Sequence, residues 1–257
     1  MDINAITVCV EYDDYLRLTL PRILQHVKTL TVVTAPKDQL TQSLVAEYPQ
    51  NRVKAHVTDA FYRDGANFNK GRALEEGFDV MVRKGWILIL DADIVLPQVL
   101  PRLVTTCGKI YGVPRRIMSN LSGLANVDNI DWHAMPLRSE GHNYGYFQLF
   151  HAEDPIITKK PWYETDWTHA GGADNNFKNR WHVDNRARLP FDVIHLGDPD
   201  QNWYGRVQKR VDTGEQLPEA ASRKAKLTAL HRRHGWVGQK RTGEAVVERI
   251  KKPTDTA

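Results

Sequence analysis

The chain has 257 residues, of which 41% are hydrophobic and 26% charged. This length suits one large α/β domain, and the composition excludes collagen-like, mucin-like and wholly disordered proteins. The longest apolar run, Trp86 to Leu90, is far shorter than the ~20 residues of a membrane span, and no basic stretch leads into an apolar one at the N-terminus. Two cysteines, Cys9 and Cys107, do not make a disulfide framework. We therefore expect a cytoplasmic protein without anchor, export signal or integral membrane association.

The net charge of +4 is unevenly distributed. Residues 222–252 contain ten Lys or Arg and two Glu, a net charge of +8, which leaves the rest of the chain at −4. Such a segment can hold phosphate while the body does not, although a solvated helical face is an alternative explanation. Pro218 and alternating charges over 214–225 indicate a boundary. We expect a body over 1–213 and a basic C-terminal segment over 214–257.

The first hundred residues alternate between strand and helix patterns. The run at 86–90 is continuously apolar, as is typical of a central strand buried on both faces. The alternation predicts an α/β fold with an open, mainly parallel sheet flanked by helices. Strands are expected at 5–10, 30–34, 53–57 and 86–90, and helices at 15–30, 39–48 and 69–84.

After Pro101 the pattern loosens into connections rich in Trp, His, Asn and Gly. Polar and aromatic loops on an α/β scaffold are where ligands are usually held. The tryptophans can stack on a sugar or a base, or simply fill the core. The expected elements are strands at 109–113, 144–150 and 191–195 and a helix at 174–183; the tryptophans are Trp132, Trp162, Trp167, Trp181 and Trp203.

Two carboxylates, Asp91 and Asp93, follow the buried strand directly. Ligand sites of open α/β sheets lie outside the carboxyl ends of the strands, and residues two apart in an extended segment point the same way. Two hard oxygen ligands suit Mg²⁺ or Mn²⁺ carrying a diphosphate. Capping of the next helix is the alternative. An aspartyl-phosphate phosphatase is disfavoured, because the apolar run 94–97 replaces its small polar pair.

A second candidate is the start of the helix before that strand. Gly71 stands between Lys70 and Arg72, so backbone N–H groups, a helix dipole and two cations could bind a diphosphate. Asn69 as an ordinary helix cap is the alternative.

Two further candidates lie downstream. Asp174 starts a helix just after Gly171 and Gly172, where it could serve as a general base or only as a cap. His195 ends a strand and could add an imidazole to a Mn²⁺ site, although a lone His is more often structural.

The order of these pieces along residues 5–205 resembles that of the GT-A glycosyltransferases, a Rossmann-like fold with a D-x-D metal motif. The likeness is greatest to inverting members, including the C-terminal region of galactosyltransferases, where a Gly-Gly-Glu-Asp segment starts a helix over the acceptor. Ala173 stands in place of that Glu. The matching pieces are Glu11-Tyr12, Thr34-Ala-Pro-Lys-Asp38, Asn69-Lys-Gly-Arg-Ala73, Leu88-Ile-Leu-Asp-Ala-Asp93, Tyr144-Gly-Tyr-Phe-Gln148, Gly171-Gly-Ala-Asp-Asn-Asn-Phe177 and His195-Leu-Gly197.

The resemblance implies a nucleotide-sugar donor, UDP-linked, bound by residues 1–100, and an acceptor half over 101–213. It implies Mn²⁺ or Mg²⁺ at Asp91, Asp93 and His195, with Asp91 beside the ribose or sugar. Asp174 would deprotonate the acceptor hydroxyl, giving inversion. The implied donor contacts are Val10, Glu11, Tyr12, Asp38, Asn69, Lys70, Arg72, Asp91, Ala92 and Gly172.

The acceptor stays open at this stage. The basic residues 222–252 fit a phosphate backbone, so a 5-hydroxymethylpyrimidine in DNA is one hypothesis and a surface glycan or protein another. A nucleotidyltransferase is a third, disfavoured because the stretch after the first strand, Glu11 to Asp14, is acidic. A non-enzymatic nucleic-acid-binding protein would leave the strand-end carboxylates unexplained.

Overall fold

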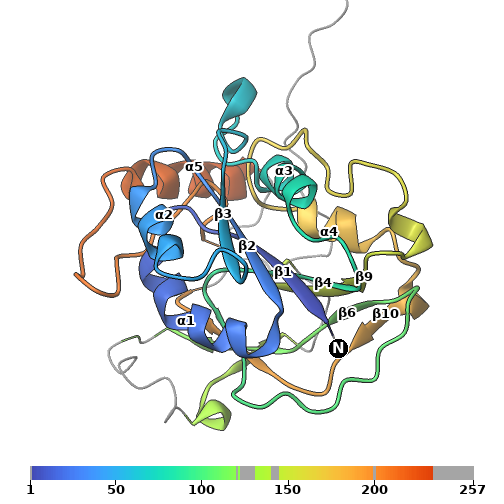
Figure 1. Ribbon diagram of the computed structural model, residues 1–257. Helices are drawn as coiled ribbons and strands as arrows, with labels where there is room; N and C mark the ends of the chain where they lie inside the picture. The colour runs from blue at the N-terminus through green and yellow to red at the C-terminus, as the bar shows by residue number, and fades with distance from the viewer. Residues whose placement is uncertain (1, 120, 122–130, 140–144, 199–200, 234–257) are drawn as a thin grey trace, which may run out of the picture.

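A computed structural model describes residues 2–119, 121, 131–139, 145–198 and 201–233. A seven-stranded sheet forms its centre, in the order β10-β6-β9-β4-β1-β2-β3 (Figure 1). The expected fold class, a mainly parallel sheet flanked by helices, is confirmed.

The N-terminal half of the sheet is parallel throughout, and its strands and helices follow the expected order along the chain. Helix α1 begins at Asp13 rather than residue 15 and ends at His26 rather than residue 30, and the strand expected over 5–10 is β1, which lies two residues earlier. The elements are β1 (Ile3–Val8), α1 (Asp13–His26), β2 (Thr29–Thr34), α2 (Gln39–Ala46), β3 (Val53–Val57), η1 (Arg63–Gly65), α3 (Lys70–Val80) and β4 (Trp86–Leu90).

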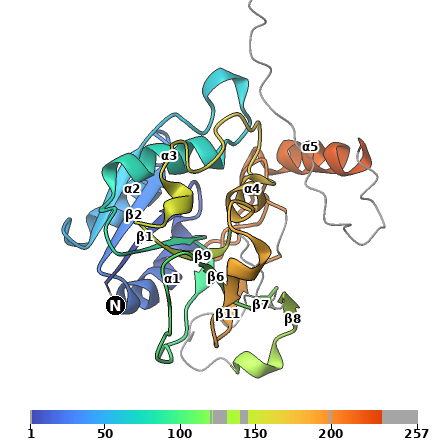
Figure 2. The ribbon, with the colours of Figure 1, turned by 90° about the vertical axis from the view of Figure 1, so that its right-hand side faces the viewer.

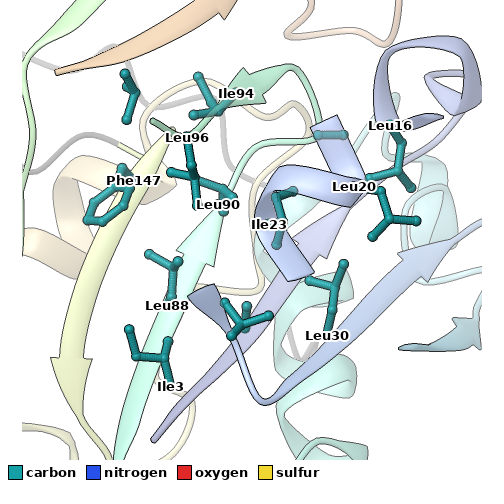
Figure 3. Close-up of a cluster of buried hydrophobic side chains, with 14 of the residues drawn as sticks. Ile3, Leu16, Leu20, Ile23, Leu30, Leu88, Leu90, Ile94, Leu96 and Phe147 are labelled. Atoms are coloured by element: carbon teal, nitrogen blue, oxygen red, sulfur yellow. The ribbon is translucent and has the colours of Figure 1, made fainter. Parts of the chain in front are cut away.

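Alternate residues of each central strand point into two separate cores. Leu88 and Leu90 of β4 face α1 and α2, whereas Ile87 and Ile89 face α3 and α4 (Ala173–Lys178). Figure 1 shows the sheet between these two helical layers. In Figure 3 the α1 side chains Leu16, Leu20 and Ile23 lie over the strands. Both faces of β4 are therefore buried, as its apolar sequence predicts.

Two further helices end earlier than the sequence pattern suggested, by four and five residues. The helix expected to reach residue 84 ends at Val80, because Met81 is extended and packs into the core beside α3. The helix expected over 174–183 is α4, which ends at Lys178 because Trp181 turns inward to bind Asp154. Apolar residues that follow each helix fit its hydrophobic periodicity, although the chain is no longer helical there.

Beyond β4 the sheet continues in mixed directions, and a second sheet forms. Strand β9 (Phe147–His151) is antiparallel to β4; residue 144, where it was expected to begin, lies outside the described residues. The strand expected over 191–195 is β11 (Val193–Leu196), in the second sheet. The other elements are β6 (Ile110–Gly112), η3 (Trp132–Ala134), η4 (Pro155–Ile157), η5 (Val183–Asn185) and β10 (Arg186–Arg188), with β5 (Ile94–Val95), β7 (Arg115–Met118) and β8 (Leu137–Ser139) in the second sheet.

The C-terminal helix α5 (Ala220–Arg233) begins inside the stretch expected as a boundary and packs against the body. Leu227 and Leu230 are buried against Trp203 and Tyr204. Figure 2 shows α5 on the same side of the molecule as α4 and the second sheet. The rest of the basic segment, from residue 234 onward, lies outside the described residues.

Among the described residues, no helix combines the length and hydrophobicity that crossing a membrane requires.

Candidate functional site

The first part of the site joins Asp93 to His195. The short strand β5 pairs antiparallel with β11 and sets Ile94 opposite His195, so the preceding Asp93 lies beside the imidazole. The His195 Nε2 atom is 3.8 Å from Asp93 Oδ2, and these side chains are 7% and 10% exposed. Two residues 102 positions apart are thus brought together at the carboxyl edge of the sheet.

The environment of this pair is suited to a cation. Burial raises the pKa of Asp93 above its ordinary value, and the facing His195 opposes the rise. Asp93 Oδ1 is buried and has no hydrogen-bond partner within the described part of the chain. The other ring nitrogen of His195, Nδ1, lies 3.4 Å from the Gly197 carbonyl, which orients the ring. A divalent cation would satisfy the orphaned oxygen and the facing nitrogen together.

The second part of the site centres on Lys70, the first residue of α3. Its Nζ atom donates to Asp91 Oδ1 at 2.7 Å and lies 3.5 Å from Asp174 Oδ1. The Lys70 side chain is 9% exposed, whereas Asp91 and Asp174 keep 33% and 22% exposure. Two acids 83 residues apart in sequence therefore share one buried ammonium.

The sequence suggested Asp91 as a metal ligand beside Asp93, but the structure directs its carboxylate to Lys70. Over the described ranges, no group of three or more His, Cys, Asp or Glu side chains could together hold a metal ion. Asp93 and His195 supply two facing ligand atoms of the kinds that a divalent cation takes.

Three further residues surround Asp174: Gly145 and Gln148, which lie in the Tyr144 to Gln148 piece of the resemblance, and Tyr163, which the sequence did not single out. The Tyr163 hydroxyl lies 3.3 Å from Asp174 Oδ1 and also donates to the side-chain oxygen Oε1 of Gln148, and the Gln148 side-chain Nε2 donates to the Asp174 backbone carbonyl at 3.1 Å. A Cβ atom at Gly145 would lie 1.9 Å from the Asp174 Cγ atom. Burial raises the Asp174 pKa, and Lys70 opposes the rise. Gln148, a polar residue inside an apolar strand, was the one signal available in the sequence.

At the carboxyl ends of β1 and β2, Asp38 organises the segment after β1. It caps α2 by accepting the Thr41 N–H at 3.1 Å, and its other oxygen accepts the Glu11 N–H at 2.6 Å. Glu11 has a φ of +62°, a conformation that non-glycine residues rarely adopt. This strained turn follows directly from β1, and the preceding Val10 is buried.

Helix α5 reaches this same turn. The Arg223 guanidinium donates to both carboxylate oxygens of Glu11, at 3.2 Å for Oε1 and at shorter range for Oε2. Arg206 donates to the Glu11 carbonyl at 2.6 Å, and Tyr12 donates to Gln208 at 2.7 Å. Glu11 and Tyr12 are thus bound within the chain by residues from its C-terminal part.

The remaining candidates have local structural roles. Asn69 caps α3, accepting the Arg72 N–H at 2.9 Å, which confirms the cap alternative. The Arg72 side chain pairs with Asp64 at 2.8 Å, and the Ala92 carbonyl accepts from Thr19 at 2.8 Å. Gly172, with a φ of +106°, lies against Trp167, so its lack of a side chain is required by packing. The tryptophans Trp162, Trp167 and Trp181 are buried in the core.

No family model and no curated protein matches the chain, but solved structures do. TarS of S. aureus matches with a TM-score of 0.52 and 10% identity, over 94% of this chain and 46% of that one. Glucosyl-3-phosphoglycerate synthase of Mycobacterium tuberculosis, in complex with Mn²⁺, UDP and glucosyl-3-phosphoglycerate, matches at 0.43 and 12% identity over 97% and 88%. The 4-diphosphocytidyl-2C-methyl-D-erythritol synthase of Anaerococcus prevotii matches at 0.39 and 10% identity over 88% and 98%.

At 10–12% identity these matches show a similarity of fold, and among the three the TM-score exceeds 0.5 for TarS. The chain spans less than half the length of that protein. The seven-stranded sheet of this chain, with helices on both faces, agrees with the fold expected from the sequence. The likeness to TarS agrees with it as well. The chain has a fold of the GT-A glycosyltransferase type.

Proposed function

We propose that the protein is a metal-dependent glycosyltransferase that moves a sugar from a UDP-linked donor to a hydroxyl acceptor. The observation that carries the proposal is the pairing of Asp93 with His195, next to the Lys70–Asp91–Asp174 cluster at the same edge of the sheet. A cation site adjoining a partly buried carboxylate provides the two functions that glycosyl transfer needs: neutralising a leaving diphosphate and removing a proton from a hydroxyl.

Asp93 and His195 would hold Mn²⁺ or Mg²⁺, since the orphaned Asp93 oxygen and the imidazole are the available ligands. The bound cation would supply positive charge to the diphosphate as it leaves. Asp91, held by Lys70, is proposed to contact the ribose or the sugar. The other proposed donor contacts follow β1 and β2: Val10, Glu11, Tyr12 and Asp38.

Asp174 is proposed as the general base. Its carboxylate accepts the proton of the acceptor hydroxyl, and the hydroxyl oxygen forms a bond to the anomeric carbon. The bond from that carbon to the diphosphate oxygen breaks, and its electron pair stays on the diphosphate. Attack from the face opposite the leaving group inverts the anomeric centre. A raised pKa suits Asp174 to this role, because it brings the base nearer to neutral pH.

For the acceptor, the exposed cations Lys224 and Arg232 of α5 support an anionic molecule such as DNA carrying 5-hydroxymethylpyrimidine. Arg223 and Lys226 contribute less, because they bind Glu11 and Asn67 within the chain. Binding of such DNA that falls steeply with added salt would support this acceptor. Salt-independent or undetectable binding would favour an uncharged glycan or a protein.

The proposal is tested by incubating the protein with UDP-glucose, UDP-galactose and UDP-N-acetylglucosamine, and measuring UDP release with water as acceptor. We expect release that requires Mn²⁺ or Mg²⁺, stops with EDTA and falls strongly in Asp174→Asn. Release unaffected by EDTA, or none from any donor, would contradict the proposal. Pyrophosphate release from a nucleoside triphosphate would point instead to a nucleotidyltransferase.

A further inference from the structure

Lys70 joins the two halves of the candidate site. It stands at the start of α3, while Asp91 follows β4 and Asp174 lies in the first turn of α4. Its Nζ atom is 2.7 Å from the first carboxylate and 3.5 Å from the second. Burial by itself lowers the pKa of Lys70, but the two carboxylates outweigh this effect and raise it. Lys70 therefore stays protonated, as a fixed positive charge between two acids.

The contacts of Asp174 are one-sided. Lys70 and Tyr163 both approach Oδ1, at 3.5 and 3.3 Å. Across the described ranges no side chain forms a hydrogen bond to Oδ2, and the Asp174 side chain keeps 22% exposure. Gly145 presses against the carboxylate from a further side, where even one Cβ atom would overlap it. One oxygen is thus anchored, and the other accepts no hydrogen bond from a side chain of the described residues.

We propose that Lys70 is a positioning residue: it anchors Asp174 through Oδ1 at a fixed place beside Asp91, and so presents Oδ2 to the acceptor hydroxyl. This assignment replaces the sequence-based expectation that Lys70 binds the donor diphosphate. It rests on the proposed function, because it gives Asp174 the role of base. Misplacing a base by about 1 Å can cost roughly 100-fold in rate, so an anchor of this kind affects turnover more than donor binding.

A double-mutant cycle of Lys70→Met and Asp174→Asn separates the two roles of Lys70. Calorimetry with UDP and Mn²⁺ gives donor affinity, and UDP release from UDP-glucose or UDP-galactose gives kcat and KM. We expect Lys70→Met to lower kcat about 100-fold, with UDP affinity within about threefold of wild type. In the Asp174→Asn background, we expect Lys70→Met to lower kcat by no more than about twofold. Lost UDP affinity, or effects that multiply in the double variant, would overturn the proposal and make Lys70 a donor ligand.

Two further variants guard against a purely structural effect. Lys70→Arg keeps the charge and is expected to recover at least part of kcat, which a general loss of stability would not allow. Lys84→Met removes an exposed lysine before β4 and should leave kcat unchanged. If Lys70→Met does not fold, the kcat and KM of Lys70→Arg decide: a change in KM alone would overturn the proposal.

A crystal structure of Lys70→Met provides a readout without substrate. We expect the Asp174 carboxylate to leave its contact with Tyr163, since two uncompensated acids would then repel each other. An unmoved Asp174 would overturn the positioning role whatever the enzyme's substrate. Absence of UDP binding in the wild type, with Asp174 displaced in the variant, would instead refute the proposed function and keep the anchor.

Discussion

Arg206 donates to both carboxylate oxygens of Asp14, at 2.5 and 2.7 Å, and neither side chain exposes any surface. The residues are 192 positions apart, so the pair fixes the segment after β11 to the start of α1. The guanidinium also lies over the rings of Tyr12 and Tyr15, and its Cζ atom is 4.9 Å from the centroid of each ring. This contact holds the segment after β11 against the strained Glu11 turn.

We predict that Arg206→Met destabilises the protein by about 3–5 kcal/mol, because it leaves a buried carboxylate without its partner. The matched control is Arg17→Met, which breaks the exposed pair with Glu47 and should cost no more than about 1 kcal/mol. Urea unfolding of both variants measures the difference. Equal costs would show that the buried pair does not fix the segment in place.

Gly145→Ala is predicted to displace the Asp174 carboxylate, because the added Cβ atom would lie within 2.1 Å of its three terminal atoms. UDP release should fall strongly while UDP affinity is retained. The control is Gly145→Ala in an Asp174→Ala background. The overlap is absent there, so Gly145→Ala should lower the free energy of unfolding by less than it does in the wild type. A wild-type rate in Gly145→Ala would mean that Asp174 is not the base or that its position is unimportant.

Glu75 gives a prediction about pH. Burial raises its pKa above the ordinary value, although its Oε1 atom accepts the Tyr163 N–H at 2.6 Å. Because the folded-state pKa exceeds the unfolded one, this group favours folding at low pH, and that contribution is lost as pH rises through the raised pKa. Glu75→Gln keeps an acceptor without charge, so the free energy of unfolding of this variant, relative to that of the wild type, should increase as the pH rises above the ordinary pKa of Glu.

The comparison for Glu75 is Glu47, whose pKa is lowered by its hydrogen bond to Arg17. Its contribution is present at neutral pH and lost as pH falls, so Glu47→Gln should show the opposite trend. Thermal unfolding measured both below and above the ordinary pKa of Glu tests the two variants. A pH-independent difference for Glu75→Gln would show that its carboxyl group is not perturbed by burial.

The contact between α5 and Glu11 predicts a local effect of mutation. Arg223→Ala removes both hydrogen bonds to the Glu11 carboxylate and should raise amide exchange along α5, while β1 and β4 keep their protection. Lys224→Ala, an exposed neighbour on the same helix, is the control. Equal exchange in the two variants would indicate that the contact between Arg223 and Glu11 does not stabilise α5.

Much of the N-terminal half follows from local pattern. The apolar run at 86–90 and the alternation around it predict β4 and its parallel neighbours, because each pattern reports which faces are buried. The strands β5, β7 and β8 have two to four residues, too few for a period to be recognised. Their existence depends on tertiary pairing, and so does the approach of His195 to Asp93.

The site was predictable in its parts but not in its connections. Asp91, Lys70 and Asp174 each carry a local signal, at a strand end or a helix start. Nothing in their spacing shows that one ammonium lies between both acids, since that depends on how α3, β4 and α4 pack. Tyr163 gave no signal at all, because it lies outside any helix or strand and is identified only by its contact with Asp174.

The most direct test of the account is calorimetric titration of UDP into the wild type and Asp93→Asn, with Mn²⁺ and again with EDTA. Our account predicts UDP binding that requires Mn²⁺ in the wild type and is lost in Asp93→Asn, whose far-ultraviolet circular dichroism remains that of the wild type. UDP binding that persists in EDTA or in Asp93→Asn would contradict the cation site at Asp93 and His195. The absence of UDP binding under any of these conditions would contradict the proposed donor.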